Sequence, residues 1–387
     1  MRSPAVLSAL AAATALTVLA AAPATSQSFD TQAPFAFLKD TNSDLILFER
    51  GADEPMPPAS MAKMMTVLVA FDQIDKGKMS LKDTCQVRPD TWRAWSNQGS
   101  TMFLKVNEVV SVSDLLHGIV TASGNDASVV LAECIAGTVD AFAGAMNAMG
   151  EQIGLTGSHF TTANGWPDEG EYVTARDLAR IAEVTIEDHP KLYEQFYTTK
   201  EFTHGETMSG EPITQPNRNP IFGRVRGADG LKTGHTEAAG YGFTGSAERD
   251  GRRLVMVVAG LPSMSARRDE STRFLEWGFN AFEGAQLQPG KVLAQAAVYN
   301  GSKDTISLTA KDGAMLTLPK AIVSDVNARI VYKSPLPAPL QAGQEVGKLH
   351  VKAGDMPEQV IPLVAGEAVE EAGFFTRAIN GFKSLIG

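Results

Sequence analysis

The pattern of apolar residues changes after Glu283, and this change divides the chain of 387 residues into two regions that must fold differently. Before it, stretches with apolar residues at helical spacing alternate with stretches typical of strands. After it, short β-rich runs are separated by turn signals such as Asn300-Gly301. Residues 286–290 have the composition of a linker. We therefore expect a domain of mixed helices and strands over residues 27–284 and a small all-β domain over residues 285–366.

The first region has the pattern of an α/β (α+β) domain, in which helices pack on a sheet. The expected helices cover residues 60–75, 110–135, 139–153 and 273–283, and the expected strands lie within 35–50 and over 241–247 and 254–261. In the second region, the β-rich runs cover residues 292–298, 305–308, 315–318, 328–332 and 346–351.

Residues 1–26 have the features of an export signal. Arg2 supplies a positive start, residues 5–22 are almost all apolar, and small residues over 22–26 offer cleavage sites. A transmembrane anchor is the alternative, but the polar residues that follow favour cleavage. No other stretch reaches the ~18 apolar residues that a spanning helix needs. We expect the mature protein to lie outside the inner membrane.

Residues 367–387 predict an amphipathic helix at the end of the chain. Phe374, Phe375 and further apolar residues fall on one face at helical spacing, and Arg377 and Lys383 lie on the other. Such a helix suits an in-plane membrane anchor, and a helix packed on its own domain is the alternative. The two end segments together predict a periplasmic protein that binds the outer face of the inner membrane.

Charge and residue usage argue against several function classes. The formal net charge is −10 and no basic stripe with interleaved aromatic residues occurs, so we expect no nucleic-acid partner. The six histidines form no metal-binding motif, so we expect no metal and no cofactor. Export would permit a disulfide between Cys85 and Cys134, but two cysteines do not make a disulfide-stapled scaffold. We predict two buried thiols instead of a bridge.

Ser60 and Lys63 form the only S-x-x-K motif of the chain. A serine hydroxyl is a poor nucleophile at neutral pH and needs a base within hydrogen-bond reach. Positions i and i+3 share a face of a helix, so a neutral Lys63 could accept the proton of Ser60. The preceding Pro57-Pro58 fits a helix start. Short motifs of this kind also arise by chance, so the pair needs further support.

Two further motifs follow the first one along the chain. Ser123-Gly124-Asn125 lies where helical stretches meet, and Lys232-Thr233-Gly234 lies at a predicted strand start. The order S-x-x-K, S-x-N and K-T-G resembles the motif set of serine penicillin-binding proteins and β-lactamases. The middle motif of that set is S-D-N, and Gly124 stands at its second position here. The resemblance implies the β-lactamase/transpeptidase-like fold for the first domain.

The surrounding residues narrow the resemblance to one family. Residues 53–60, 123–127, 230–236 and 275–279, together with Arg176-Asp177, are similar to the D-alanyl-D-alanine carboxypeptidases. These are low-molecular-mass, serine-type penicillin-binding proteins of peptidase family S11. The small β-domain and the amphipathic tail match the layout of that family, so the resemblance covers nearly the whole mature chain.

The resemblance implies a peptidoglycan stem peptide ending in D-Ala-D-Ala as the substrate. Ser60 would attack the carbonyl of the penultimate D-Ala with Lys63 as the base, and burial and the nearby cation Lys232 would lower the pKa of Lys63. Ser123 would relay the proton to the leaving amine, and Asn125 would hold the substrate amide and orient Lys63. Water would then release the acyl group. A β-lactam would acylate Ser60 and hydrolyse slowly.

The resemblance also assigns residues around the nucleophile. The backbone N–H groups of Ser60 and His235 would bind the oxyanion. The substrate-binding strand is Lys232-Thr233-Gly234, in which the lysine and the threonine would bind the terminal carboxylate.

The assignments at the edge of the pocket are less direct. Arg267 matches an arginine that helps to bind the carboxylate, although the neighbouring Arg268 leaves the alignment open by one position. Ser100 is expected to border the pocket, and we interpret Arg218 as structural. Residues 163–166 differ from the family pattern, so this edge is expected to bind the stem peptide differently.

Three alternatives compete with a carboxypeptidase that limits crosslinking. A class A β-lactamase needs a glutamate between the second and third motifs. Between Asn125 and Lys232, no glutamate has the asparagine four residues on that such an enzyme requires. A D,D-endopeptidase shares the three motifs, so the motifs leave it open. A wall-binding scaffold without activity would not need Ser60 or Lys63.

Overall fold

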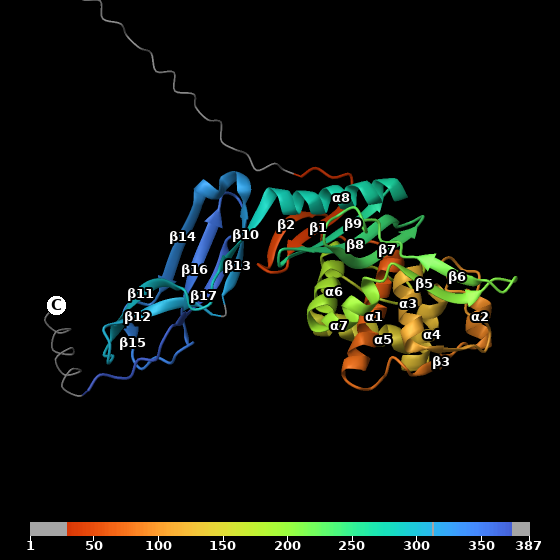
Figure 1. The fold of residues 1–387 in the computed structure, drawn as a ribbon, viewed down its shortest axis with the longest axis horizontal. Coiled ribbons are helices and arrows are strands. Elements are labelled where there is room, and N and C mark those ends of the chain that lie inside the picture. The colour runs from red at the N-terminus through yellow and green to blue at the C-terminus, as the bar shows by residue number, and fades with distance from the viewer. Residues whose placement is uncertain (1–28, 312, 374–387) are drawn as a thin grey trace, which may run out of the picture.

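The computed structural model describes residues 29–311 and 313–373, which form two bodies side by side (Figure 1). The predicted export signal and residues 374–387 of the predicted terminal helix lie outside the described residues. The larger body is centred on an antiparallel sheet with the order β2-β1-β9-β8-β7. Its strands are β1 (Phe35–Asp40), β2 (Leu45–Arg50), β7 (Ala228–Thr236), β8 (Gly240–Arg249) and β9 (Arg252–Leu261).

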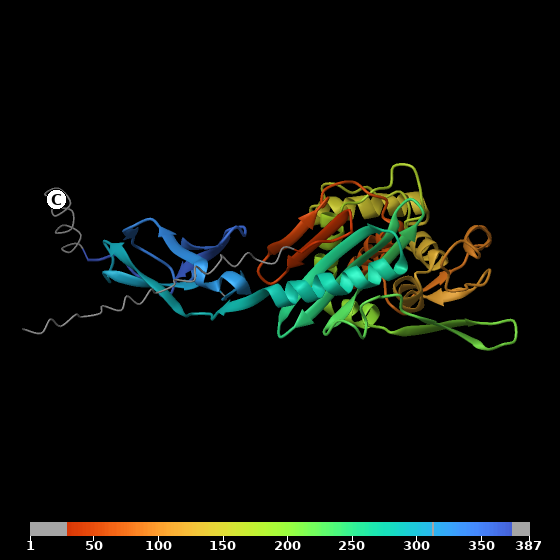
Figure 2. The same ribbon diagram turned by 90° about the horizontal axis from the view of Figure 1, so that it is seen from above.

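Helices bury both faces of this sheet. Along β9, Val255 and Val257 contact one core, and Met256 between them contacts the other, as the two-residue period of a strand requires. The helix α8 (Met264–Ala281) covers one face, and α1 (Lys63–Asp75) lies with the other helices against the opposite face (Figures 1 and 2). The expected sheet with helices packed on it is therefore confirmed.

The remaining elements of this body surround α1 on its side of the sheet, and one hairpin of β5 and β6 projects from it (Figure 2). They are β3 (Thr84–Gln86), α2 (Pro89–Trp95), β4 (Val109–Ser111), α3 (Val112–His117), η2 (Gly118–Ala122), α4 (Asn125–Ala136), α5 (Val139–Ile153), α6 (Ala175–Asp188), α7 (Pro190–Tyr197), β5 (Glu201–Glu206) and β6 (Pro212–Pro216).

The helical spacing predicted over residues 110–135 is interrupted at Ser123, where helical stretches were expected to meet, and its first residues belong to a strand. The segment begins as β4, continues as α3 and the π-helical turn η2, and resumes as α4. The break lies at Ser123, which has a left-handed φ of 62°, a conformation that no helix interior accepts. The apolar spacing runs across the break, so periodicity alone could not reveal it.

Two further boundaries differ from the predictions. The helix expected over 273–283 begins nine residues earlier, at Met264, because the Ser263 hydroxyl caps it by accepting from the Ala266 N–H. The first turns of α8 are rich in charged residues, so the apolar spacing that indicates a helix is absent there. The K-T-G motif lies in the middle of β7 and not at a strand start.

The smaller body is all-β, as predicted. One sheet pairs β10 with β13, and the other has the order β14-β16-β17-β12-β11-β15. The elements are β10 (Phe282–Leu287), β11 (Val292–Tyr299), β12 (Thr305–Ala310), β13 (Ala314–Pro319), η3 (Lys320–Asp325), β14 (Val326–Tyr332), β15 (Leu336–Pro337), β16 (Glu345–Ala353) and β17 (Gln359–Ala365). The segment predicted as a linker begins inside β10. The helix predicted over residues 367–387 does not begin at 367, because residues 367–373 are not helical and Val369 still pairs with Leu340 of the β-domain.

The prediction of two buried thiols is wrong. Cys85 and Cys134 form a disulfide, with their Cα atoms 5.6 Å apart, and Cys134 is exposed. The bridge joins β3 to α4, which pack against each other. The two cysteines are 49 residues apart in sequence, so the sequence could not show that their Cα atoms lie at a distance that suits a disulfide.

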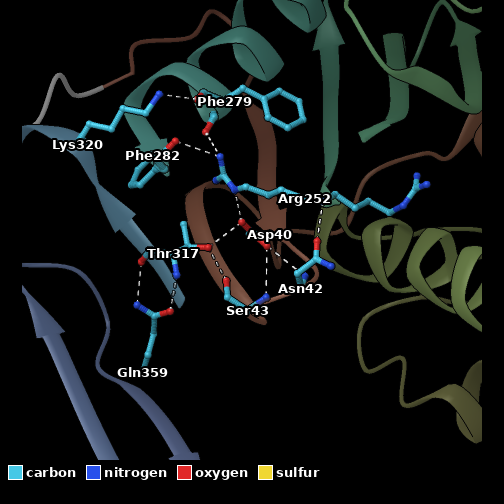
Figure 3. A network of polar contacts seen from close by, with 11 residues as sticks. Asp40, Asn42, Ser43, Arg252, Phe279, Phe282, Thr317, Lys320 and Gln359 are labelled. Carbon is cyan, nitrogen blue, oxygen red and sulfur yellow. Dashed lines mark hydrogen bonds and ion pairs between the residues drawn. The ribbon is translucent and has the colours of Figure 1, made fainter. Parts of the chain in front are cut away.

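A buried polar network joins the two bodies (Figure 3). The carboxylate of Asp40, which is fully buried at the end of β1, accepts from Arg252 Nε at 2.5 Å and from Thr317 Oγ1 at 2.7 Å. The Gln359 side chain in turn bonds both backbone groups of Thr317. Arg252 Nη1 donates to the Phe282 carbonyl, where the chain passes into the β-domain. Because these buried contacts tie residues of both bodies to the same carboxylate, they favour one arrangement of the two bodies.

Among the described residues, no single helix is long and apolar enough to cross a membrane. The pair α4 and α5 reaches the necessary length and composition only together, and the two helices meet at an angle of 84°.

Candidate active site

Ser60 lies in the short 3-10 helix η1 (Ala59–Ala62), at the point where the chain enters α1. Ala59 before it has a positive φ of 46°, so the backbone turns sharply there. The Ser60 side chain is only partly exposed and lines a cavity of about 500 Å³. The local backbone thus presents one hydroxyl to an accessible space.

Lys63 is the first residue of α1 and has no exposed surface. Its Nζ lies 2.8 Å from Ser60 Oγ, 2.7 Å from Asn125 Oδ1 and 2.6 Å from the Asn164 carbonyl oxygen. A neutral amine has two hydrogens and one lone pair. If it donates to the two fixed acceptors, its lone pair faces the Ser60 hydroxyl. The arrangement therefore suits a base for that serine.

The environment of Lys63 favours this neutral form. Burial, and secondly the charge of Arg218, lower the pKa of Lys63 to about 7. We expected the charge of Lys232 to lower the pKa of Lys63, but the larger perturbation is at Lys232. Burial lowers the pKa of the Lys232 amine, and the charge of Lys63 lowers it further. Repulsion between two buried amines makes it unfavourable to charge both.

The second motif lies at the broken helix. Ser123 Oγ accepts from Lys232 Nζ at 2.9 Å, and the left-handed conformation of Ser123 holds its side chain at the cavity. Because its oxygen accepts from the lysine, its own hydroxyl hydrogen is free for a further partner. Asn125 begins α4 and donates from Nδ2 to the Gln98 carbonyl while Oδ1 accepts from Lys63. The two residues predicted from this motif therefore contact the amines of the other two motifs: Asn125 binds Lys63, and Ser123 binds Lys232.

The third motif lies on β7, which is an edge strand of the sheet. Every second peptide N–H of an edge strand points away from its neighbour and is available to a ligand. Thr233, Gly234 and His235 line the cavity, and the His235 ring stacks on Tyr241 with 3.8 Å between the ring centroids. A Cβ atom at Gly234 would lie 3.0 Å from the Pro58 carbonyl, so the glycine lets the strand approach the nucleophile turn closely.

Two arginines give the far side of the cavity a positive charge. Arg267, which is 6% exposed, lines the cavity, and burial lowers its pKa to about 10. Its neighbour Arg268 pairs with Asp269 away from this cavity, which resolves the one-position ambiguity in favour of Arg267. Arg218 also lines the cavity and donates to Ser100 Oγ. The interpretation of Arg218 as merely structural therefore missed its place at the site.

The structure gathers the predicted residues around one cavity, together with some that the motifs did not indicate. Tyr241 and Met264 are the additional ones, and the Asn164 carbonyl comes from residues 163–166, which were expected at the edge of the site. Over residues 29–311 and 313–373, no cluster of three or more His, Cys, Asp or Glu side chains could hold a metal ion. The cavity is lined by Ser60, Gly99, Ser100, Ser123, Arg218, Thr233, Gly234, His235, Tyr241, Met264 and Arg267.

Fold and site together define a serine enzyme that forms an acyl intermediate. Residues 20–263 match the family model of the D-alanyl-D-alanine carboxypeptidases, peptidase S11, and residues 285–371 match the C-terminal domain of penicillin-binding protein 5. The chain belongs to the S11 family of D-alanyl-D-alanine carboxypeptidases.

Relatives match this chain over most of its length. D-alanyl-D-alanine carboxypeptidase DacC of Escherichia coli K12 is 36% identical, over 88% of this chain and 85% of the relative. The DacA enzyme of Haemophilus influenzae is 38% identical, over 87% and 85% of the two chains. The crystal structure of penicillin binding protein 5 from H. influenzae superposes with a TM-score of 0.79 at 37% identity, over 89% of this chain and 99% of that chain.

Proposed function

We propose that this enzyme removes the terminal D-alanine from peptidoglycan stem peptides that end in D-Ala-D-Ala, through an acyl-enzyme on Ser60. The observation that carries the proposal is the fully buried amine of Lys63, held by two fixed acceptors with its third contact on Ser60 Oγ. The family of the chain supports the substrate. Three motifs that meet at one cavity support the reaction.

Acylation follows from these contacts. The Ser60 proton passes to Lys63 Nζ as the bond forms between Ser60 Oγ and the carbonyl carbon of the penultimate D-Ala. When the tetrahedral intermediate collapses, the C–N bond to the terminal D-Ala breaks. The leaving amine takes the hydroxyl proton of Ser123, and Ser123 Oγ takes a proton in turn from Lys232 Nζ, which donates to it. Lys63 has gained one proton and Lys232 has given one up, so the two amines together still hold a single charge.

The developing charges meet donors that are already in position. The oxyanion would lie between the backbone N–H groups of Ser60 and His235, and the loss of one such donor typically costs ~10²–10³ in rate. The terminal carboxylate would bind Thr233 and the cations Lys232, Arg267 and Arg218. These side chains lie on the same cavity or bond directly to a residue that does.

Water then hydrolyses the ester at Ser60 and restores the free hydroxyl. A β-lactam presents a strained amide and a carboxylate to the same groups. Ser60 would open the ring, and the stable acyl-enzyme would block the site. Asn125 would hold the amide of either ligand while it orients Lys63.

The location of the enzyme is a separate proposal. We infer that it is exported and binds the outer face of the inner membrane peripherally through the last residues of the chain. The composition of residues 1–26 and the two-faced pattern of residues 374–387 support this inference.

The test of activity is the release of D-alanine from a pentapeptide that ends in D-Ala-D-Ala. The wild-type enzyme should release one equivalent, and Ser60→Ala should lower the rate at least ~10³-fold. Ser209→Ala is a matched control on the exposed tip between β5 and β6, and it should retain full activity. Absence of D-alanine release by the folded wild type, or full activity in Ser60→Ala, would overturn the proposal.

A further inference from the structure

Glu171 is a buried carboxyl group that the reaction described above does not use. It lies in the segment between α5 and α6, and only 9% of its surface is exposed. Both of its carboxylate oxygens face the Thr162 hydroxyl, at 3.1 and 2.9 Å. A buried carboxyl group is costly unless it makes such contacts, so the position of Glu171 needs an explanation.

The contacts of Glu171 lead to the base of the reaction. Thr162 Oγ1, which donates to Glu171, also accepts from the Gly165 N–H at 2.9 Å. This bond closes the turn over residues 162–165. The Asn164 carbonyl within that turn accepts from Lys63 Nζ at 2.6 Å. Two hydrogen bonds, one from Thr162 to Glu171 and one from Gly165 to Thr162, therefore connect the Glu171 carboxylate to the turn whose carbonyl accepts from Lys63.

The turn has little freedom to move without disturbing the nucleophile. Gly165 has a φ of +69°, and a Cβ atom there would lie 1.8 Å from the Ala59 carbonyl oxygen. The residue before Ser60 thus packs directly on the turn. A shift of this turn would displace the Asn164 carbonyl from Lys63 or push against the backbone of Ser60.

We propose that Glu171 is a positioning residue for Lys63: through Thr162 it holds the turn whose Asn164 carbonyl fixes the amine against Ser60. This inference rests on the proposed function of Ser60 and Lys63. It assigns the positioning of Lys63 to the segment between the second and third motifs. Within that segment, it assigns this role to a residue that touches neither the substrate nor the nucleophile.

The charge of Glu171 also acts on Lys63. Burial raises the pKa of Glu171 to about 7, with a smaller effect from Asp168, and the charge of Lys63 opposes the rise. Conversely, an ionised Glu171 raises the pKa of Lys63, as Asp126 does, against burial and Arg218. Replacing Glu171 by a neutral residue should therefore lower the pKa of Lys63 and leave the amine neutral at more acidic pH.

The test measures the second-order rate constant of acylation by a fluorescent penicillin against pH, because its acidic limb reports the free enzyme. Glu171→Gln keeps an acceptor for Thr162 but removes the charge. We expect the midpoint of its acidic limb to move down by roughly half a pH unit, with a plateau within about threefold of the wild type. The two limbs should converge at lower pH, because Glu171 with a pKa of about 7 is itself protonated there. Glu169→Gln is the matched control, because Glu169 is an exposed acid of the same segment. It should leave the limb in place.

Thr162→Val tests the positioning role by keeping the charge and removing the bridge. We expect its plateau rate to fall about tenfold or more, and Thr162→Ser should restore it. A Glu171→Gln limb whose midpoint coincides with that of the wild type, or a wild-type plateau in folded Thr162→Val, would overturn the inference. If Thr162→Val does not fold, the Glu171→Gln profile decides. A wild-type enzyme that no penicillin acylates would instead refute the proposed function.

Discussion

At the scale of single residues, the protonation of Lys63 controls the proposed reaction. The amine can accept the proton of Ser60 only when it is neutral, and burial lowers its pKa to about 7. Below that pH the protonated amine has no lone pair for the serine. Above it, all three contacts of Nζ can be satisfied while the lone pair faces Ser60 Oγ.

The acylation rate of the wild-type enzyme should therefore fall about tenfold for each pH unit below about pH 7 and level off above it. Stopped-flow measurement of penicillin acylation between pH 5 and 9 checks this expectation. A rate that stays constant down to pH 5 would mean that Lys63 is not the base. Lys105→Met, which removes an exposed lysine, is the control and should keep the wild-type profile.

Gly165 provides a second test at the residue scale, because a Cβ atom there would overlap the Ala59 carbonyl. Gly165→Ala should lower the acylation rate on the order of 10²-fold, since a displacement of about 1 Å at the nucleophile has that effect. The matched control is Gly170→Ala. Gly170 also has a positive φ, of +90°, but its Cβ atom would meet nothing closer than 4.0 Å. Equal losses in the two variants would show that backbone strain alone is responsible.

At the scale of secondary-structure elements, the sequence predicted the residues of the site better than the packing of the backbone around them. The three motifs indicated Ser60, Lys63, Ser123, Asn125 and Lys232, which the structure joins by hydrogen bonds. Their order along the chain could not show that β7 runs past η1, because close packing at Gly234 depends on contacts distant in sequence.

The contribution of Arg218 had no usable local signal, because its contact with Ser100 joins residues 118 positions apart. The same holds for the Asn164 carbonyl, since any residue can supply a backbone oxygen to Lys63. The motif marked a junction of helical stretches within residues 110–135, but the apolar spacing that continues across Ser123 did not show its left-handed φ. A motif identifies side-chain chemistry, and tertiary packing decides the backbone around it.

The disulfide gives a prediction for the elements that it joins. It links β3 to α4, whose first residue is Asn125 of the site. The double variant Cys85→Ala/Cys134→Ala should lose about 2–4 kcal/mol in the free energy of unfolding, because the bridge restricts the unfolded chain. Urea denaturation with and without a reductant measures the loss. A wild-type midpoint that does not change on reduction would contradict the expectation.

At the scale of the whole molecule, the network around Asp40 determines how the two bodies meet (Figure 3). Asp40→Ala would leave the buried guanidinium of Arg252 without its carboxylate, and such a change costs about 3–5 kcal/mol. We expect a lower thermal midpoint and faster proteolysis between α8 and the β-domain. Asp44→Asn is the control, because asparagine tolerates the positive φ of 59° at this position and the carboxylate that is removed is 86% exposed. Its ion pair with Lys39 should contribute less than about 1 kcal/mol.

The proposed membrane contact is also a property of the whole molecule. Deletion of residues 374–387 should move the exported protein from the membrane fraction to the soluble fraction, because these residues carry the apolar face. Fractionation of cells that produce the two forms measures the change. The truncated enzyme should retain its D-alanine release in solution. An unchanged membrane-bound fraction would refute the anchor.

The central claim is that Ser60 alone becomes covalently bound. Its most direct test is mass spectrometry of the enzyme quenched with acid after brief exposure to benzylpenicillin, followed by peptide mapping. We predict a single penicilloyl group per chain, on the peptide that contains Ser60, and none in Ser60→Ala. An adduct on another residue, such as Ser123, or an adduct that persists in Ser60→Ala, would contradict the account.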